Sequence, residues 1–541
     1  MFSRKVQARC LFSLFAGLLS SLGFAPVSFW PVTIMGIMAL MAAADGVRCR
    51  PEIFCVGWAF GFGQSALSLH WLAQAFQYQT SLPSWTGGAA VLVLAGYLAL
   101  YPALALTFAK WVARDGATFR MLAFPAAWVL AEWSRGWLFT GFAWNPLGVI
   151  WIDVPIIAEI AGWVGATGLS GLTVALAGSF LQFVRRHRFF LGLQTAVLVF
   201  AAIAPRPALG TKSGGIRVRI VQPNIGQDEK WQTDLSRRHR QTLLTLSGRP
   251  RGDGRVRLIF WPEAAITEEI ERAPHIRKEL ADMLGPRDLL LTGGIAIEQV
   301  AGGGAPTAHN SMFVIDSNTE VIARYDKTHL VPFGEYVPSF AKWAGLDRFV
   351  AGQVEFREGP GPRSLALPGL PKVAVNICYE MTFPGRVVDP ADRPAFIFNP
   401  SNDAWFGKWG PPQHLAQARL RAIEEGLPVI RSTSTGISAI IRPDGSVASS
   451  IPLDTAGFID AGLPPPDPPT LFSHWGHWPT LTMAGLAILG AAFQRRRRRS
   501  NFSEKRGVEI ATKQLAKPRR QVSAHGADGN VSPIDEVAGL H

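Results

Sequence analysis

The stretch Val373-Ala-Val-Asn-Ile-Cys-Tyr-Glu-Met-Thr-Phe-Pro384 joins a short apolar run to several polar and reactive side chains. An apolar run of this kind predicts a buried strand, here with Cys378 at its end. The other cysteines, Cys10, Cys49 and Cys55, lie in or beside the hydrophobic N-terminal third. A cysteine at a strand end is a candidate nucleophile when acid and lysine partners accompany it. The alternative interpretation is a small buried hydrophobe, which describes most free cysteines.

The sequence around this stretch predicts an α/β domain. From Gly215 onward, short β-branched runs alternate with helical stretches, a pattern typical of layered α/β folds. Helices are expected over 232–247 and 413–425. Strands are expected over 216–221, 256–261, 289–296, 311–315, 373–377, 396–399, 429–432 and 437–441.

Hydrophobic residues make up 48% of the 541-residue chain and are concentrated before about residue 206 and again near residue 480. A membrane span needs about 20 apolar residues, and the pattern predicts a polytopic membrane protein. The first segment also allows a cleaved signal peptide, and the first two allow a single helix with a re-entrant piece. The expected spans are 8–24, 29–45, 52–74, 87–110, 120–135, 156–183, 189–205 and 476–494.

Basic residues gather in alternate loops between these segments. By the positive-inside rule both termini are expected in the cytoplasm, and the segment from about 206 to 475 is expected outside it. The loops that carry this signal contain Arg4, Lys5, Arg9, Arg48, Arg50, Lys110, Arg114, Arg120, Arg185, Arg186, Arg188 and Arg495 to Arg499.

The net charge of +13 does not indicate a nucleic-acid partner. Residues 495–541 hold 11 Lys/Arg and 5 Asp/Glu and so carry +6 of that charge, directly after an apolar segment. This position is typical of a cytoplasmic membrane anchor. The eleven histidines are scattered, so we expect no metal site and no organic cofactor.

One loop expected outside the cytoplasm, 132–145, is rich in Trp and Phe and contains Glu132 and Arg135. Aromatic residues are typical of the membrane interface. The two charged residues near a membrane surface also suit contact with a lipid head group.

Three segments begin as a strand and end in a reactive side chain. They present Glu263, then Lys327 with Glu335, then Cys378. A carboxylate can take the proton of a thiol, a lysine ammonium can stabilise an oxyanion, and a thiolate can hold an acyl group as a thioester. Together these side chains predict acyl transfer, although a single Glu or Lys at a strand end is more often a solvated surface group.

The full set of motifs resembles the nitrilase superfamily, and specifically its membrane-bound branch, the apolipoprotein N-acyltransferases. The resemblance covers almost the whole chain and includes Gly23-Phe-Ala-Pro26, Asn399-Pro-Ser-Asn-Asp-Ala-Trp-Phe-Gly407, and the run from His414 to Glu424. It implies an α-β-β-α sandwich inserted before the last membrane helix.

The resemblance also implies roles for individual residues. Glu263 would be the general base, Lys327 the oxyanion stabiliser and Cys378 the nucleophile. Supporting or substrate-binding roles would fall to Glu335, Tyr379, Glu380 and Trp231. The alternatives are packing at a helix start for Trp231 and shaping of the turn for Tyr379 and Glu380.

The loop-like stretch 333–353 carries four aromatic residues, among them Trp343. Exposed aromatic residues beside an active site near a bilayer can dip into lipid and admit an acyl chain. The alternative is an ordinary packed loop.

These expectations divide the chain into four parts. They are a seven-helix transmembrane domain (1–205), an extracytoplasmic nitrilase-like catalytic domain (206–470), an eighth transmembrane helix with a basic anchor (471–499) and a disordered cytoplasmic tail (500–541). The resemblance implies a bacterial inner-membrane enzyme. It would move an acyl chain from a phospholipid donor, through a Cys378 thioester, to the N-terminal amino group of diacylated apolipoproteins.

Two other functions are compatible with parts of the sequence. A membrane-tethered nitrilase-type amidase would use the same three side chains with water in place of the amine. A scaffold or transporter would use the α/β domain only for binding. The presence of Glu263, Lys327 and Cys378 favours an enzyme.

Overall fold

The computed structural model describes residues 3–78, 83–113, 115–184, 215–250, 255–300, 304–339, 343 and 356–515. Residues Met1–Ala491 form one compact unit, and Ala492–His541 form a second. The expected span 189–205 lies outside the described residues.

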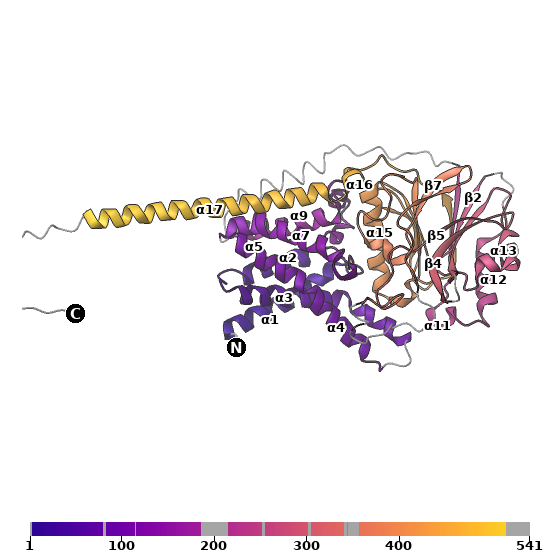
Figure 1. The fold of residues 1–541 in the computed structure, drawn as a ribbon, viewed down its shortest axis with the longest axis horizontal. Helices are drawn as coiled ribbons and strands as arrows, with labels where there is room; N and C mark the ends of the chain where they lie inside the picture. Colours follow the sequence, from indigo (N-terminus) through magenta and orange to yellow (C-terminus); the bar gives the residue numbers. More distant parts are fainter. Residues whose placement is uncertain are drawn as a thin grey trace, which may run out of the picture. The chain divides into compact units, whose positions relative to one another are not determined.

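The N-terminal part is a bundle of helices, drawn in indigo to magenta in Figure 1. Three helical stretches in the described part of the chain are long and apolar enough to cross a membrane: Arg4–Gly23, Thr86–Val112 and Ala161–Val184. The long helices are α1 (Arg4–Ser20), α2 (Trp30–Ala43), α3 (Arg50–Ser68), α4 (Thr86–Leu98), α5 (Leu100–Val112), α7 (Phe124–Arg135) and α9 (Ala161–Val184). The shorter helical segments between them are η1 (Ser21–Gly23), η2 (His70–Tyr78), α6 (Gly116–Thr118), η3 (Phe119–Ala123), η4 (Leu138–Thr140), η5 (Leu147–Trp151) and α8 (Pro155–Ala158).

Helices α1 and α3 pack closely because a small residue lies where they meet. At Gly63 of α3, a Cβ atom would overlap the carbonyl oxygen of Leu14 and lie 3.0 Å from the backbone nitrogen of Leu18, both in α1. Such close approach of two backbones is typical of membrane helices, where small residues allow tight van der Waals packing.

The α/β domain contains two six-stranded sheets. The first has the strand order β12-β1-β2-β3-β4-β5 and the second β11-β10-β9-β8-β7-β6. The strands of the first sheet are β1 (Arg217–Gln222), β2 (Arg257–Phe260), β3 (Leu289–Val300), β4 (Gly304–Asp316), β5 (Val321–Asp326) and β12 (Gly457–Gly462). Those of the second are β6 (Ser364–Leu367), β7 (Leu370–Val375), β8 (Phe396–Ser401), β9 (Val429–Thr433), β10 (Ser438–Ile441) and β11 (Val447–Ile451).

The two sheets face each other across one apolar core. Phe260 of β2 lies against Phe396 and Phe398 of β8, with ring centroids 6.1 and 4.8 Å apart. Helices α12 (Ser236–Ser247) and α13 (Pro274–Ala281) cover the outer face of the first sheet, and α15 (Gly410–Glu425) covers the second. The layers are therefore α-β-β-α, which confirms the expected fold class (Figure 1).

The parallel pairs β1–β2–β3 and β7–β8–β9 run through the middle of the two sheets. Loops that follow parallel strands leave the sheet at the same edge, so residues far apart in sequence meet there. The shorter helical pieces of this domain are α11 (Gln227–Lys230), η6 (Ile270–Arg272), η7 (Cys378–Thr382) and η8 (Asp403–Trp405).

The chain after the sandwich continues through α16 (Leu471–Trp475) into α17 (Trp478–Leu515). Helix α17 extends to Leu515, so residues 500–515 are helical where disorder was expected. The segment is poor in aromatic residues but rich in good helix formers such as Glu, Lys and Arg, which explains the difference. Residues 516–541 lie outside the described part of the chain.

We expect Gly63→Ala to lower the melting temperature of the detergent-solubilised protein, measured by scanning fluorimetry. Overpacking costs about 1–3 kcal/mol, which outweighs the gain of roughly 1 kcal/mol in helix propensity. The matched control is Gly88→Ala in α4, where a Cβ atom has nothing within 4 Å. An equal or raised melting temperature for both variants would contradict the tight α1–α3 contact.

Candidate active site

The carboxylates expected at two strand ends converge on one buried lysine. Lys327 Nζ donates to Glu335 Oε1 at 2.9 Å and to Glu263 Oε1 at 3.3 Å. Asn310 Nδ2 donates to the same two oxygens, at 2.7 Å for Glu263 and 2.8 Å for Glu335. All four side chains are largely buried.

Asn310 was not expected from the sequence. It lies in β4, one residue before the predicted strand 311–315, and no motif marks it. Its amide bridges Glu263 and Glu335, so it supplies donors to two carboxylates that would otherwise repel each other.

Glu263 follows the end of β2, and its backbone passes very close to the neighbouring strand β3. A Cβ atom at Gly293 of β3 would lie 2.5 Å from the nitrogen of Ala264 and 2.6 Å from the oxygen of Pro262. Only glycine lets the Glu263 backbone pass this close. The second carboxylate oxygen, Oε2, accepts the backbone N–H of Asn402 at 2.8 Å, so the second sheet also fixes the orientation of the acid.

Cys378 lies at a sharp turn three residues beyond the end of β7, which ends at Val375 rather than at the expected residue 377. Its φ of +52° is in the left-handed region, which a residue with a side chain rarely adopts. His414 Nε2 lies 3.0 Å from the Cys378 carbonyl oxygen. Such strained backbone is found where surrounding structure holds a functional residue in place.

Glu380 ties this turn to the loop that carries Lys327. Its Oε2 accepts the N–H of Ile377 at 2.6 Å, and its Oε1 accepts the N–H groups of Thr328 at 2.6 Å and His329 at 3.1 Å. The buried carboxylate therefore fixes the cysteine turn relative to the lysine loop.

The electrostatic environment favours an ionised acid beside a protonated thiol. Burial alone raises the pKa of Glu263, but the charges of Lys327 and Lys230 and the Asn310 hydrogen bond bring the pKa below its ordinary value. Burial and the nearby Glu263 carboxylate raise the pKa of the Cys378 thiol well above its ordinary value, and Lys327 only partly opposes them. The Glu263 carboxylate is thus ionised and able to accept a proton, whereas the Cys378 thiol is held in its protonated form.

A second buried lysine, Lys230, was also missed. Its Nζ donates to the backbone oxygen of Glu263 at 2.8 Å, and burial lowers its pKa to about 8. Lys230 directly precedes Trp231, which was itself a predicted site residue. The sequence alone, however, does not show that this lysine is buried.

Cys378, Asp403 and His414 each place a potential metal-ligand atom within 4.8 Å of the others. The Asp403 and His414 ligand atoms already have other partners. Asp403 Oδ2 pairs with Arg431 at 2.6 Å, and the His414 ring nitrogens contact Asp403 and the Cys378 carbonyl oxygen. We therefore interpret the group as a brace for the cysteine turn.

The other predicted site residues lie around this cluster. The Tyr379 hydroxyl donates to the Gly141 carbonyl oxygen at 3.2 Å and packs in an apolar cluster that includes Trp71, Tyr101 and Trp144. This cluster joins the cysteine turn to the helical bundle.

The structure does not bring the two predicted tryptophans into the buried cluster. Trp231 is 48% exposed and Trp343 is 92% exposed. Within the described residues, neither hydrogen-bonds to Glu263, Lys327 or Cys378.

Gln413 holds the bundle against the α/β domain. Its Oε1 accepts from Trp71 Nε1 at 3.1 Å, from Trp144 Nε1 at 2.9 Å and from Asn145 Nδ2 at 2.9 Å. Its Nε2 donates to the Ser68 carbonyl oxygen at 3.1 Å. Gln413 is followed directly by His414, so the residue that contacts the bundle is adjacent in sequence to the residue that braces the Cys378 turn.

A four-layer sandwich with these buried polar residues at one sheet edge is a carbon-nitrogen hydrolase fold, here joined to membrane-spanning helices. The family model described as carbon-nitrogen hydrolase matches residues 217–467, and the model described as the apolipoprotein N-acyltransferase N-terminal domain matches residues 16–179. The chain belongs to the apolipoprotein N-acyltransferase family.

Relatives in two bacteria support this membership. An apolipoprotein N-acyltransferase of Rhodopseudomonas palustris is 34% identical, and one of Bradyrhizobium diazoefficiens is 35% identical. Each alignment covers 90% of this chain and 95% of the relative. A carbon-nitrogen hydrolase structure from Helicobacter pylori G27 aligns with 56% of this chain and 98% of its own, at 14% identity and a TM-score of 0.34.

We expect Glu263→Gln to slow alkylation of Cys378 by iodoacetamide about 100-fold or more at pH 7, because a positioned base contributes about 10²–10⁴-fold. Peptide mass spectrometry of the full-length protein measures the rate. Glu320→Gln, at an exposed acid on the same domain, is the matched control. Equal rates in the two variants would show that Glu263 does not activate the thiol.

Proposed function

We propose that this protein transfers a fatty acyl chain from a membrane phospholipid to the N-terminal amino group of S-diacylglyceryl-cysteine in apolipoproteins. The observation that carries the proposal is the buried Glu263 carboxylate, which lysines hold ionised and which raises the pKa of the nearby Cys378 thiol, in a domain packed on helices long and apolar enough to span a membrane. The family membership supports the same reaction.

The first half-reaction loads the enzyme. Glu263 takes the thiol proton of Cys378, and the sulfur attacks the carbonyl carbon of a phospholipid ester. The carbon–oxygen ester bond then breaks as the tetrahedral intermediate collapses. Glu263 returns the proton to the leaving oxygen, so the products are a lysophospholipid and a Cys378 thioester.

The second half-reaction transfers the acyl group. The neutral α-amino group of the apolipoprotein attacks the thioester carbon, and Glu263 accepts a proton from the nitrogen. The carbon–sulfur bond breaks, and the proton passes to the Cys378 sulfur. The sequence of two acyl transfers is a ping-pong mechanism, and it uses no cofactor.

Lys327 is the proposed oxyanion stabiliser in both halves. Its ammonium lies between Glu263 and Glu335 at hydrogen-bond distance, and a fixed positive charge in a buried site stabilises developing negative charge strongly. Glu335 and Asn310 orient this ammonium and the Glu263 carboxylate. Glu380 is proposed to position the Cys378 turn.

Three aromatic residues are proposed to handle the lipid substrates. Tyr379 directly follows Cys378 and packs in the apolar cluster shared with the bundle, and we propose that an acyl chain approaches the sulfur along this side. The exposed rings of Trp231 and Trp343 are proposed to contact the lipid or lipoprotein at the entrance. Amphipathic aromatic rings are favoured at membrane interfaces.

The topology proposed for this reaction places the protein in the bacterial inner membrane. The part from 206 to 470 would be the periplasmic catalytic domain, with residues 1–205 and 471–499 forming the membrane part and both termini in the cytoplasm. The alternating basic loops of the sequence support this orientation.

The test of this function uses mass spectrometry of the full-length protein in phospholipid micelles. We expect a fatty-acyl adduct on Cys378 that is absent in Cys378→Ser and disappears when a diacylated lipopeptide is added. An adduct that water removes at the same rate without lipopeptide would instead support an amidase-type hydrolase. An intact wild type without any adduct would overturn the acyl-enzyme proposal.

A further inference from the structure

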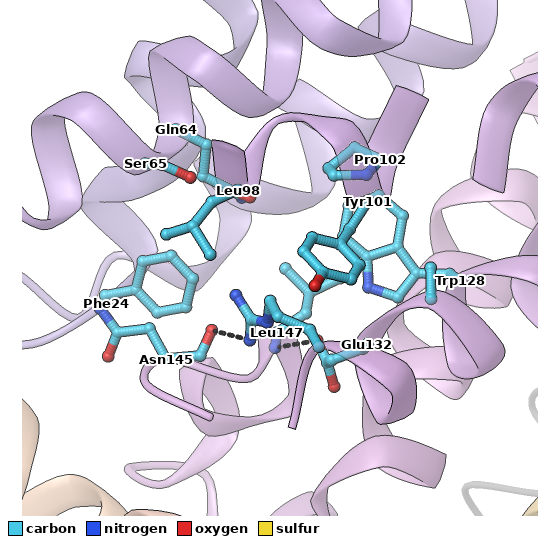
Figure 2. A pocket seen from close by; sticks show the side chains of 12 residues that line it. Phe24, Gln64, Ser65, Leu98, Tyr101, Pro102, Trp128, Glu132, Asn145 and Leu147 are labelled. Atoms are coloured by element: carbon cyan, nitrogen blue, oxygen red, sulfur yellow. Dashed lines mark hydrogen bonds between the residues drawn. The ribbon is translucent and has the colours of Figure 1, made fainter. Parts of the chain in front are cut away.

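A pocket in the helical bundle gathers charged and polar side chains that the proposed reaction does not use. It lies between α3, α5 and α7 and encloses about 30 Å³. Figure 2 shows apolar and polar side chains lining one space. The residues used below are Tyr101, Trp128, Glu132, Arg135 and Asn145.

The pocket contains an acid and a base that do not pair with each other. Glu132 and Arg135 lie one turn apart on α7, yet the described residues show no ion pair between them. Glu132 Oε2 accepts the N–H of Leu147 at 2.9 Å, and Arg135 Nη2 lies 3.5 Å from the backbone oxygen of Asn145 (dashed in Figure 2). Backbone groups of the loop after α7 therefore engage the two charges separately.

Three buried atoms of this pocket have no partner with hydrogen-bond geometry, although Ser170 and Trp128 lie close to the Glu132 carboxylate: Glu132 Oε1, Arg135 Nε and Asn145 Oδ1. Buried polar atoms in proteins nearly always have one, so three around a single cavity point to a ligand site. The three atoms are closed to solvent. The terminal torsions of Glu and Asn side chains are soft, so rotation of these groups can present the oxygens to a ligand.

The chemistry of these atoms defines the class of ligand. A primary ammonium group has three N–H donors, and the two acceptor oxygens, one of them a carboxylate oxygen, can accept two of them. A guanidinium beside them matches an anion, because Arg recognises phosphate and carboxylate groups. Trp128 and Tyr101 add aromatic faces to the same wall.

We propose that this pocket binds the primary ammonium group of a lipid substrate, with Glu132 as counter-ion and Asn145 as second acceptor. Arg135 would bind the adjoining anion. The inference rests on the proposed function and adds to it a site of substrate selection. The ammonium has two possible sources, the head group of an aminophospholipid donor or the α-amino group of the lipoprotein acceptor.

The pocket is linked to the nucleophile through a short chain of contacts. Asn145 Nδ2 donates to Gln413 Oε1 at 2.9 Å, and the neighbouring His414 Nε2 lies 3.0 Å from the Cys378 carbonyl oxygen. Asn145 is therefore connected through Gln413 of α15 to the residue that braces the cysteine turn.

Binding is tested with full-length Cys378→Ala protein, which cannot form a thioester. Native mass spectrometry compares phosphatidylethanolamine with its N-acetyl derivative of identical acyl chains. We expect at least a tenfold preference for the free amine, lost in Cys378→Ala/Glu132→Gln. Cys378→Ala/Glu52→Gln is the matched control, because Glu52 lies at the other end of α3, in its first turn.

A second arm compares a diacylated lipopeptide with its N-acetyl derivative in the same proteins. A Glu132-dependent preference in this arm alone assigns the ammonium to the acceptor, and a preference in the first arm alone assigns it to the donor. Both outcomes support the pocket. Equal binding of free and acetylated amines in both arms would overturn it and leave a pocket that holds water only.

Two further comparisons keep the inference separate from the proposed function. If Glu132→Gln fails to fold, Cys378→Ala/Glu132→Asp replaces it, because the shorter side chain withdraws the carboxylate from the ligand and should also weaken the preference. A wild type that forms no thioester but keeps an amine preference that depends on Glu132 would contradict the proposed function and support the pocket. A wild type that forms the thioester but shows no amine preference would support the proposed function and contradict the pocket.

Discussion

The site depends on one carboxylate that stays ionised in a buried place. Glu263 is held between Asn310, Lys327 and the backbone of Asn402, with Lys230 on its own carbonyl oxygen. An unpaired charge in such surroundings would be neutralised by a raised pKa. The two lysines prevent this, and the carboxylate in turn keeps Lys327 charged. Burial and this carboxylate raise the pKa of the Cys378 thiol, and a protonated thiol reacts with oxidants more slowly than a thiolate does.

The sandwich exists to bring these residues together. Glu263 follows a strand of the first sheet, and Cys378 and Asn402 follow strands of the second, so only the stacked sheets place them side by side. Glu380 then fastens the cysteine turn to the lysine loop, and Gln413 fastens the same region to the helical bundle. The apolar cluster around Tyr379 continues from the bundle to the cysteine turn.

Much of this could be predicted from sequence because it leaves a local signal. Short apolar strands alternating with helical stretches predicted the layered α/β fold, which the structure confirms, and the position of Glu263, Lys327 and Cys378 at strand ends drew attention to them. Asn310 and Lys230 could not be predicted, because their roles arise from burial against residues distant in the chain. Disorder was also expected after residue 500, where α17 continues to Leu515. The prediction weighted the low aromatic content above the helix propensity of the segment. The roles of the site residues remain predictions that chemistry must test.

The most direct test is the protonation state of Glu263. Infrared difference spectra between the wild type and Glu263→Gln, recorded from pH 7 to pH 4, isolate the signal of this carboxyl group. The account predicts an ionised carboxylate down to pH 5, with protonation only below the ordinary glutamate pKa of about 4.3, and at higher pH in Lys230→Met. A protonated Glu263 at pH 7 in the wild type would contradict the account, because no base would then be present to activate Cys378.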